Sequence, residues 1–217
     1  MRTVFDENLE DIHEELSKLG RMVNIAIEKS VEALVEHDVD IANEVKEGDK
    51  EINQMQNDID QKCYEIIALQ QPNTFDLRRV MAVMRAASEL ERMGDHAENI
   101  ADVTINVKGT KRDHELEEQI SEIGDIINEM CHDIIEAFID FDVERARKTA
   151  KEDRLVDRLY NDLRLSALTL MEKDKKYVLA AADYSFVGMH LERIGDYIKN
   201  IAEWIVYLDT GEISDLG

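Results

Sequence analysis

The sequence predicts an all-α protein built from two tandem antiparallel three-helix bundles that are related by an internal duplication. Three observations predict this class. Residues that interrupt helices are scarce, with 9 Gly and 1 Pro in 217 residues. Apolar residues recur with the 3.6-residue period of a helix, and one twelve-residue segment occurs twice. Because 44% of the residues are apolar, the chain can bury a sizeable core.

The duplicated segment begins at Leu90 and again at Leu191. Leu-Glu-Arg-Met-Gly-Asp-His-Ala-Glu-Asn-Ile-Ala recurs 101 residues later as Leu-Glu-Arg-Ile-Gly-Asp-Tyr-Ile-Lys-Asn-Ile-Ala, identical at eight of twelve positions. Upstream the offset is 104 residues, as in the pair Gly20 and Gly124. The loop before the third helix absorbs the difference, because loop closure costs grow slowly with length. We therefore expect one repeat over residues 1–110 and a second over residues 111–217.

The first repeat is expected to hold three helices. The first carries one apolar stripe and ends at a turn near residues 36–38. The second runs from about Asp38 to Gln70, because the residue before Pro72 avoids the helical region. The third has Asp76 in its opening turn, reaches Val107 and is followed by Gly109, a residue type that favours a helix end. The stripe of the first helix consists of Leu9, Ile12, Leu16, Leu19, Val23, Ala26 and Ile27.

The second repeat follows the same scheme. Its helices are expected over residues 113–141, 142–172 and 177–208, with Gly211 closing the last one. Helices of about 30 residues are roughly 45 Å long, at 1.5 Å per residue. Rods of that length pack side by side, which predicts a pair of three-helix bundles.

Charge and composition exclude several classes of function. The formal net charge is -23, from 49 acidic and 26 basic residues, which repels nucleic acid and anionic membrane surfaces. No apolar run approaches the roughly 18 residues of a membrane span, and the N-terminus lacks a signal core, so we expect a cytoplasmic protein without membrane insertion. Cys63 and Cys131 occupy unmatched positions in the two repeats, and we expect both to be core thiols.

Pairs of oxygen-bearing side chains lie one helical turn apart at the same places in both repeats. On the third helices the pairs face away from the apolar stripe, and on the second helices they lie at its edge. If the second and third helices adjoin, four such side chains converge in each repeat. The pairs are Glu91 with Asp95, Glu192 with Asp196, Asp49 with Asn53, and Asp153 with Asp157.

Two interpretations of these pairs remain open. Oxygen ligands suit hard cations such as Fe, Mn, Mg or Ca, and suit zinc less, because His96 is replaced by Tyr197 in the second repeat. The alternative is a solvated acidic face that was copied with the gene segment. Gly94 and Gly195, inside the duplicated segment, are compatible with either the close approach of a neighbouring helix or room for an ion.

Three further features accompany the duplicated segment: Gln71-Pro72, Asp76-Leu77-Arg78, and the C-terminal Ala202-Glu203-Trp204-Ile205-Val206-Tyr207-Leu208 with Gly211-Glu212. With these features the chain resembles the PhoU family of bacterial phosphate-regulon accessory proteins over essentially its whole length. The resemblance implies two three-helix bundles, an intracellular location, dimer formation and negative regulation of phosphate uptake and signalling. It also implies two partners, the ATPase of the phosphate ABC transporter and the phosphate-sensing histidine kinase, and in some members clusters of iron or zinc on E/D-x-x-x-D motifs.

The resemblance implies a metal role for the same paired residues. Asp153, Asp157, Glu192 and Asp196 match the family pattern without departure. In the first repeat Asp49, Glu91 and Asp95 match it as well. Asn53 stands where the pattern has Asp, which puts the occupancy or nuclearity of the first site in doubt.

The leading interpretation is a non-enzymatic adaptor whose acidic or metal-bearing faces dock on the transporter and the kinase. A rival is a carboxylate-bridged di-metal oxidase, which requires inward-facing Glu-x-x-His motifs. The chain contains Glu10-x-x-His13 and Glu129-x-x-His132, but these motifs do not align between the repeats. An accessory protein of a different phosphate transporter is a further alternative. The sequence shows no nucleophile with a paired base and no phosphate-cradling Gly-rich loop, so hydrolase and kinase functions lack support.

Overall fold

Six long helices make up the structure, a computed structural model that describes residues 2–107, 111–212 and 214–216. No strand occurs among these residues, so the predicted all-α class is confirmed. The helices end within a few residues of the predicted positions. They are α1 (Arg2–Glu36), α2 (Val39–Gln70), α3 (Thr74–Asn106), α4 (His114–Asp140), α5 (Val143–Lys173) and α6 (Val178–Thr210), with the short 3-10 helix η1 (Lys175–Tyr177) before α6.

Equivalent turns join the first two helices of each repeat. Asp38 and Asp142 cap the helices that follow them, because their side chains accept hydrogen bonds from the first free backbone N–H groups. The residues just before them, His37 and Phe141, adopt left-handed backbone angles with φ of 55° and 54°. His37 and Phe141 are 104 residues apart, the upstream offset of the duplication, so the two repeats match here in backbone geometry as well.

The remaining helix ends follow local chemistry. Asn73 caps α3, and Asp76 lies in its first turn as predicted. Gly211 ends α6 in the left-handed conformation, with φ of 75°. Gly109, the predicted terminator of the third helix, lies outside the described residues, and the predicted repeat boundary after residue 110 falls at the same place.

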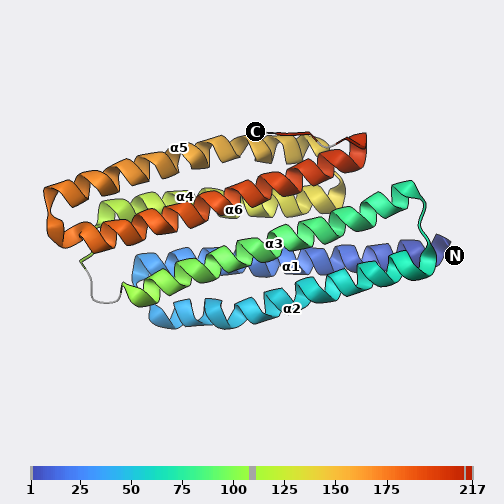
Figure 1. Cartoon of the computed structure of the whole chain (residues 1–217), viewed down its shortest axis with the longest axis horizontal. Helices are drawn as coiled ribbons and strands as arrows, with labels where there is room; N and C mark the ends of the chain where they lie inside the picture. The colour runs from blue at the N-terminus through green and yellow to red at the C-terminus, as the bar shows by residue number, and fades with distance from the viewer. Residues whose placement is uncertain (1, 108–110, 213, 217) are drawn as a thin grey trace.

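Helices α1, α2 and α3 form one bundle and α4, α5 and α6 the other, and the two bundles lie side by side along their length (Figure 1). The seam between them consists of α1 against α4 and α3 against α6. The apolar stripe predicted for the first helix is buried from Leu9 to Ile27. One core cluster therefore runs through both bundles and across the seam.

The two cysteines are buried and free, as the sequence predicts. Cys63 and Cys131 are both inaccessible to solvent and belong to the core cluster. Among the described residues, none of the helices combines the length and the apolarity that crossing a membrane would require.

Candidate functional site

The acidic residues of the first repeat meet along the line where α2 packs against α3, in the shallow groove that two packed helices leave between them. Asp49 of α2 is buried, with 7% of its surface exposed, and its Oδ2 atom accepts a hydrogen bond of 2.8 Å from Asn53 Nδ2. The Oδ1 atoms of Asp49 and Asn53 have no hydrogen-bond partner among the described residues. Glu91 and Asp95 of α3 are half-buried on the facing helix. A buried acceptor without a partner is unfavourable by about 1–3 kcal/mol, so this groove favours an added positive charge.

These carboxylates form one electrostatic cluster, because the charges of Asp49 and Asp95 raise the pKa of their neighbours. Burial, and then the charge of Asp95, raise the pKa of Asp49. The same two causes raise the pKa of Glu91, with a smaller opposing effect of Arg92. Burial and the charges of Asp49 and Asp102 also raise the pKa of Glu98. Glu98, which was not among the predicted ligands, is thus part of the cluster.

The second repeat places its acids in the corresponding groove between α5 and α6. Asp153 is 3% exposed, and its Oδ2 atom accepts a hydrogen bond of 2.8 Å from Lys199 Nζ. The same ammonium donates to Asp196 Oδ1 at 3.0 Å. Burial raises the pKa of Asp153, although Lys199 opposes the rise. Burial raises the pKa of Glu192 as well, with added repulsion from Asp196, Asp157 and Asp153.

The glycines of the duplicated segment lie where the second helix of each repeat approaches the third. A Cβ atom on Gly195 would lie 2.7 Å from Asp153 Oδ1. A Cβ atom on Gly94 would lie 3.1 Å from Ile52 Cγ2 and 3.7 Å from Asp49 Oδ1. Close helix approach therefore accounts for both glycines, and the buried carboxylate of the second helix is part of what approaches.

The donor set of these grooves fits a hard cation in its chemistry, but the side chains do not converge on one point. Buried carboxylate oxygens without partners, at Asp49 and Asp153, are what such a cation would ligate. Among the described residues, no three or more His, Cys, Asp or Glu side chains are placed to hold one ion as they stand. Binding therefore requires that Glu91 and Asp95, or their counterparts, turn toward the buried carboxylate.

Comparisons with known proteins place the whole chain in one family. The family model described as PhoU domain matches residues 16–104 and again residues 120–205. The chain belongs to the PhoU family. A phosphate-specific transport system accessory protein PhoU homolog of Clostridium acetobutylicum is 34% identical over 99% of this chain and 98% of its own length. The Escherichia coli accessory protein PhoU is 33% identical over 96% of this chain and 86% of its own length.

Solved structures confirm the architecture. The crystal structure of the regulatory protein PhoU from Streptococcus pneumoniae superposes with a TM-score of 0.91 at 34% identity, covering 97% of this chain and 99% of that one. PhoU from Pseudomonas aeruginosa gives the same TM-score at 32% identity and covers 96% of this chain. The two tandem PhoU repeats predicted from the duplicated segment are thus confirmed.

The motifs of the rival oxidase do not meet in this PhoU fold. Glu10, Glu129 and His132 are exposed. His13 packs instead against the rings of Phe138 and Phe141, with centroids 6.0 and 5.5 Å away. The two Glu-x-x-His motifs therefore do not face a shared interior, so the rival di-metal oxidase lacks the inward-facing ligands that it requires, because helical phase directs three of the four side chains to solvent.

A buried polar network at the seam between the two bundles was not predicted from the sequence. Glu117 of α4 is 2% exposed and accepts hydrogen bonds from Tyr184 Oη at 2.6 Å, Arg112 Nε at 3.0 Å and His37 Nε2 at 2.9 Å. Arg112 also donates to the backbone carbonyl of Val35. The network ties the end of α1 and the start of α6 to α4. No local pattern pointed to Glu117, because its partners Tyr184 and His37 lie 67 and 80 residues away along the chain.

Two histidines also meet across the seam between α3 and α6. His96 Nδ1 lies 2.6 Å from His190 Nδ1, so the N–H group of one ring donates a hydrogen bond to the unprotonated nitrogen of the other. The partner of His96 belongs to the other PhoU repeat, and no periodicity within one helix pointed to it.

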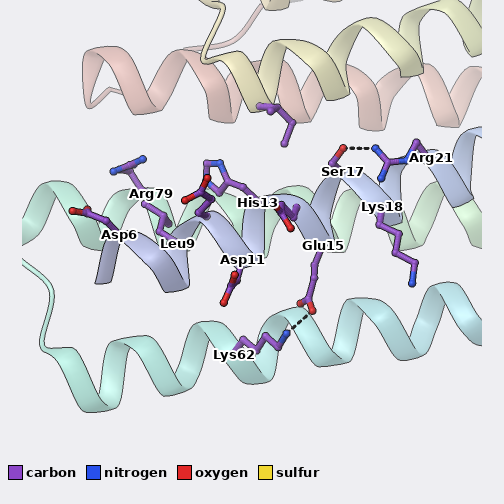
Figure 2. Close-up of a pocket in the computed structure, with 13 residues that line it drawn as sticks. Asp6, Leu9, Asp11, His13, Glu15, Ser17, Lys18, Arg21, Lys62 and Arg79 are labelled. Carbon is purple, nitrogen blue, oxygen red and sulfur yellow. Dashed lines mark hydrogen bonds and ion pairs between the residues drawn. The ribbon is translucent and has the colours of Figure 1, made fainter. Parts of the chain in front are cut away.

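Another groove, with a volume of about 1010 Å³, lies along α1. Figure 2 shows Lys62 of α2 reaching Glu15 of α1, and Arg21 bonded to Ser17 one turn away. Both acidic and basic side chains line this groove, and none of the eight predicted ligands is among the described residues that line it. The groove is therefore separate from the acidic sites of the two PhoU repeats.

Proposed function

We propose that this protein is a non-enzymatic negative regulator of phosphate uptake and phosphate-regulon signalling. In this proposal it is a cytoplasmic, homodimeric adaptor between the ATPase subunit of the phosphate ABC transporter and the phosphate-sensing histidine kinase. The observation that carries the proposal is similarity over 99% of the chain to a relative named as a phosphate-specific transport system accessory protein homolog. Because both PhoU repeats are matched, the proposal concerns the whole chain.

The acidic grooves supply the second part of the proposal, the binding of metal ions. Oxygen donors favour iron or another hard divalent cation, with zinc as a further candidate. The ligands would come from Asp49, Asn53, Glu91 and Asp95 in the first repeat and from Asp153, Asp157, Glu192 and Asp196 in the second. The unpartnered Oδ1 atoms of Asp49 and Asp153 support this role.

The formal net charge of -23 supports docking on a protein surface. The excess of acidic residues directs such contacts toward basic partners.

Binding to the purified ATPase subunit and to the cytoplasmic part of the kinase tests the adaptor. We expect both to bind the protein, and we expect a strain lacking the protein to express phosphate-regulon genes at high phosphate. Absence of binding to either partner, with metal-free and with Mn²⁺-loaded protein, would remove the adaptor. Binding only to the cytoplasmic part of another phosphate transporter would replace it by the alternative accessory role.

A further inference from the structure

The two acidic grooves differ at one position of the duplicated segment. Glu98 in the first repeat corresponds to Lys199 in the second, so the sign of the charge is reversed at otherwise equivalent places. Lys199 is held by two carboxylates from two helices, Asp153 at 2.8 Å and Asp196 at 3.0 Å. Its side chain is only 20% exposed, so solvent screens these ion pairs weakly. The ammonium thus lies where a cation would bridge α5 and α6.

Arg193, on the same helix as Lys199, also pairs with acidic residues of the second repeat. Arg193 forms ion pairs with Glu192 at 3.6 Å and with Asp196 at 3.1 Å, so it adds a second positive charge to the groove of the second repeat. Its counterpart Arg92 pairs with Glu89 at 3.9 Å, a residue outside the predicted ligand set. The acids of the second repeat are therefore compensated from within the chain.

In the first repeat no Lys, Arg or His of the described residues forms an ion pair with Asp49, Glu91 or Asp95, although Arg92 lowers the pKa of Glu91 by its charge. Lys46 of α2 pairs with Asp102, farther along α3 than Asp95, and its other electrostatic neighbour is Glu98. Asp49 and Asp153 each keep a buried Oδ1 atom without a partner, so the two repeats differ at Oδ2: in Asp49 it accepts a hydrogen bond from the neutral amide of Asn53, and in Asp153 from the ammonium of Lys199. Asp49, Glu91, Asp95 and Glu98 repel one another, and a divalent cation would reverse that repulsion.

We infer that the first repeat alone holds the hard divalent cation of this protein, and that Lys199 takes the place of the cation in the second repeat. This inference rests on the metal-binding part of the proposed function. It reverses the expectation drawn from the motif alone, in which Asn53 cast doubt on the first site. An amide in place of a carboxylate still offers an oxygen ligand, whereas a lysine ammonium offers none and repels a cation.

Mn²⁺ titration of the full-length metal-free protein tests the inference, with bound ion counted by the loss of the free Mn²⁺ EPR signal. We expect the wild type to bind one equivalent tightly. Asp49→Asn should weaken that binding at least tenfold, whereas Asp153→Asn should leave it unchanged. Glu98→Lys, which copies the second repeat, should also weaken it at least tenfold, because a lysine charge would then lie within the site.

Removing Lys199 should open the second site. We expect Lys199→Glu to bind a second equivalent, and Lys199→Gln to bind it more weakly, because glutamine removes the ammonium without adding a charged ligand. Exposed Glu129→Lys and Lys18→Glu make the same changes in net charge away from both grooves and should leave the count at one. Circular dichroism checks that each variant keeps its helices. If Lys199→Glu does not fold, binding of a second equivalent by Lys199→Gln tests whether the ammonium blocks the second site.

Several results would overturn the inference. Two equivalent tight sites in the wild type, no second equivalent in either Lys199 variant, or unchanged affinity in Glu98→Lys would each do so. Failure of any Mn²⁺ binding would overturn it together with the metal part of the proposed function. The adaptor role is decided separately by partner binding, so a protein that binds both partners and two Mn²⁺ ions would sink this inference alone.

Discussion

Gly20 of α1 lies against Ile135 of α4 so closely that a Cβ atom on Gly20 would be 2.5 Å from Ile135 Cδ1. The counterpart of this contact joins Gly124 of α4 to Val31 of α1, where a Cβ atom would be 2.9 Å from Val31 Cγ1. Both pairs are related by the 104-residue offset. The crossing of α1 and α4 is therefore one contact made twice, which is how the duplicated repeats pack on each other.

Alanine at the helix crossing should destabilise the protein. Gly20→Ala and Gly124→Ala each gain about 1 kcal/mol of helix propensity, but overpacking of a dense core costs about 1–3 kcal/mol. We expect a net loss of about 1 kcal/mol or more in the free energy of unfolding, measured by urea denaturation. Combining Gly20→Ala with Ile135→Val should recover part of the loss, because it removes the atom that a new Cβ would meet.

Gly48→Ala is the matched control. Gly48 lies inside α2, and a Cβ atom there would meet nothing within 4 Å. The same substitution should therefore stabilise the protein by about 0.5–1 kcal/mol. If all three alanine variants shifted stability in the same direction, close packing at the crossing would not be the reason for Gly20 and Gly124.

Glu117→Gln should destabilise the protein at neutral pH. Burial alone would raise the pKa of Glu117, but hydrogen bonds from Arg112, Tyr184 and His37 outweigh it and lower the pKa below 4.5. The amide replaces one accepting oxygen by a donor that faces Arg112. We expect a loss of about 2–3 kcal/mol, in the range for hydrogen bonds to charged groups.

The pH dependence of that variant separates charge from packing. Because the folded-state pKa of Glu117 is lowered, its carboxylate stabilises the fold above pH 4.5 and loses this effect as the pH falls through the folded value. The stability difference between wild type and Glu117→Gln should thus shrink in acid. Glu122→Gln, at an exposed position of α4, serves as control and should show no such difference.

His13 should contribute stability that is lost in mild acid. Burial, and then the charge of Arg79, lower the pKa of His13 from 6.5 to about 4. The unfolded chain therefore binds a proton that the folded chain excludes, and stability contributed above pH 6.5 declines as the pH falls toward 4. His13→Phe keeps a ring against Phe138 and Phe141 but cannot titrate. Its unfolding free energy should fall less between these two pH values, by no more than about 3 kcal/mol.

The two thiols should be unreactive in the native protein. Burial raises the pKa of both Cys63 and Cys131 to about 12. At about pH 8 the thiolate fraction is then negligible, and both sulfurs are also shielded from reagent. We expect a disulfide reagent to label neither thiol until guanidinium unfolds the chain, when both should react. Rapid labelling of one thiol under native conditions would show that its part of the core opens locally.

Local signals in the sequence predict most of the fold. Helix ends at residues 36, 70 and 210 were within a few residues of expectation, because Asp38, Pro72 and Gly211 act through their own backbone geometry. The apolar period predicted which side of each helix is buried, and the duplication predicted that the second bundle would resemble the first. Short-range chemistry of this kind does not depend on which helices become neighbours.

The candidate site was less predictable. The i, i+4 spacing correctly placed Glu91 beside Asp95 and Glu192 beside Asp196, since both members of a pair share one helix. The bond from Lys199 to Asp153 joins residues 46 positions apart, and its existence depends on how α5 and α6 are set against each other. His96 with His190 and Glu117 with Tyr184 are joined across still longer separations.

The amino-acid sequence by itself determined the number and limits of the helices, their buried stripes and their membership in two copies of one unit, because each depends on residues within a few turns of one another. Only the tertiary structure decided which charges meet. Two grooves with nearly the same motif differ because one residue of α6, Lys199, reaches a buried carboxylate of α5, whereas its counterpart Glu98 adds to the repulsion around Asp49. Interactions between charges depend on distance and burial, and the packing of whole helices sets both.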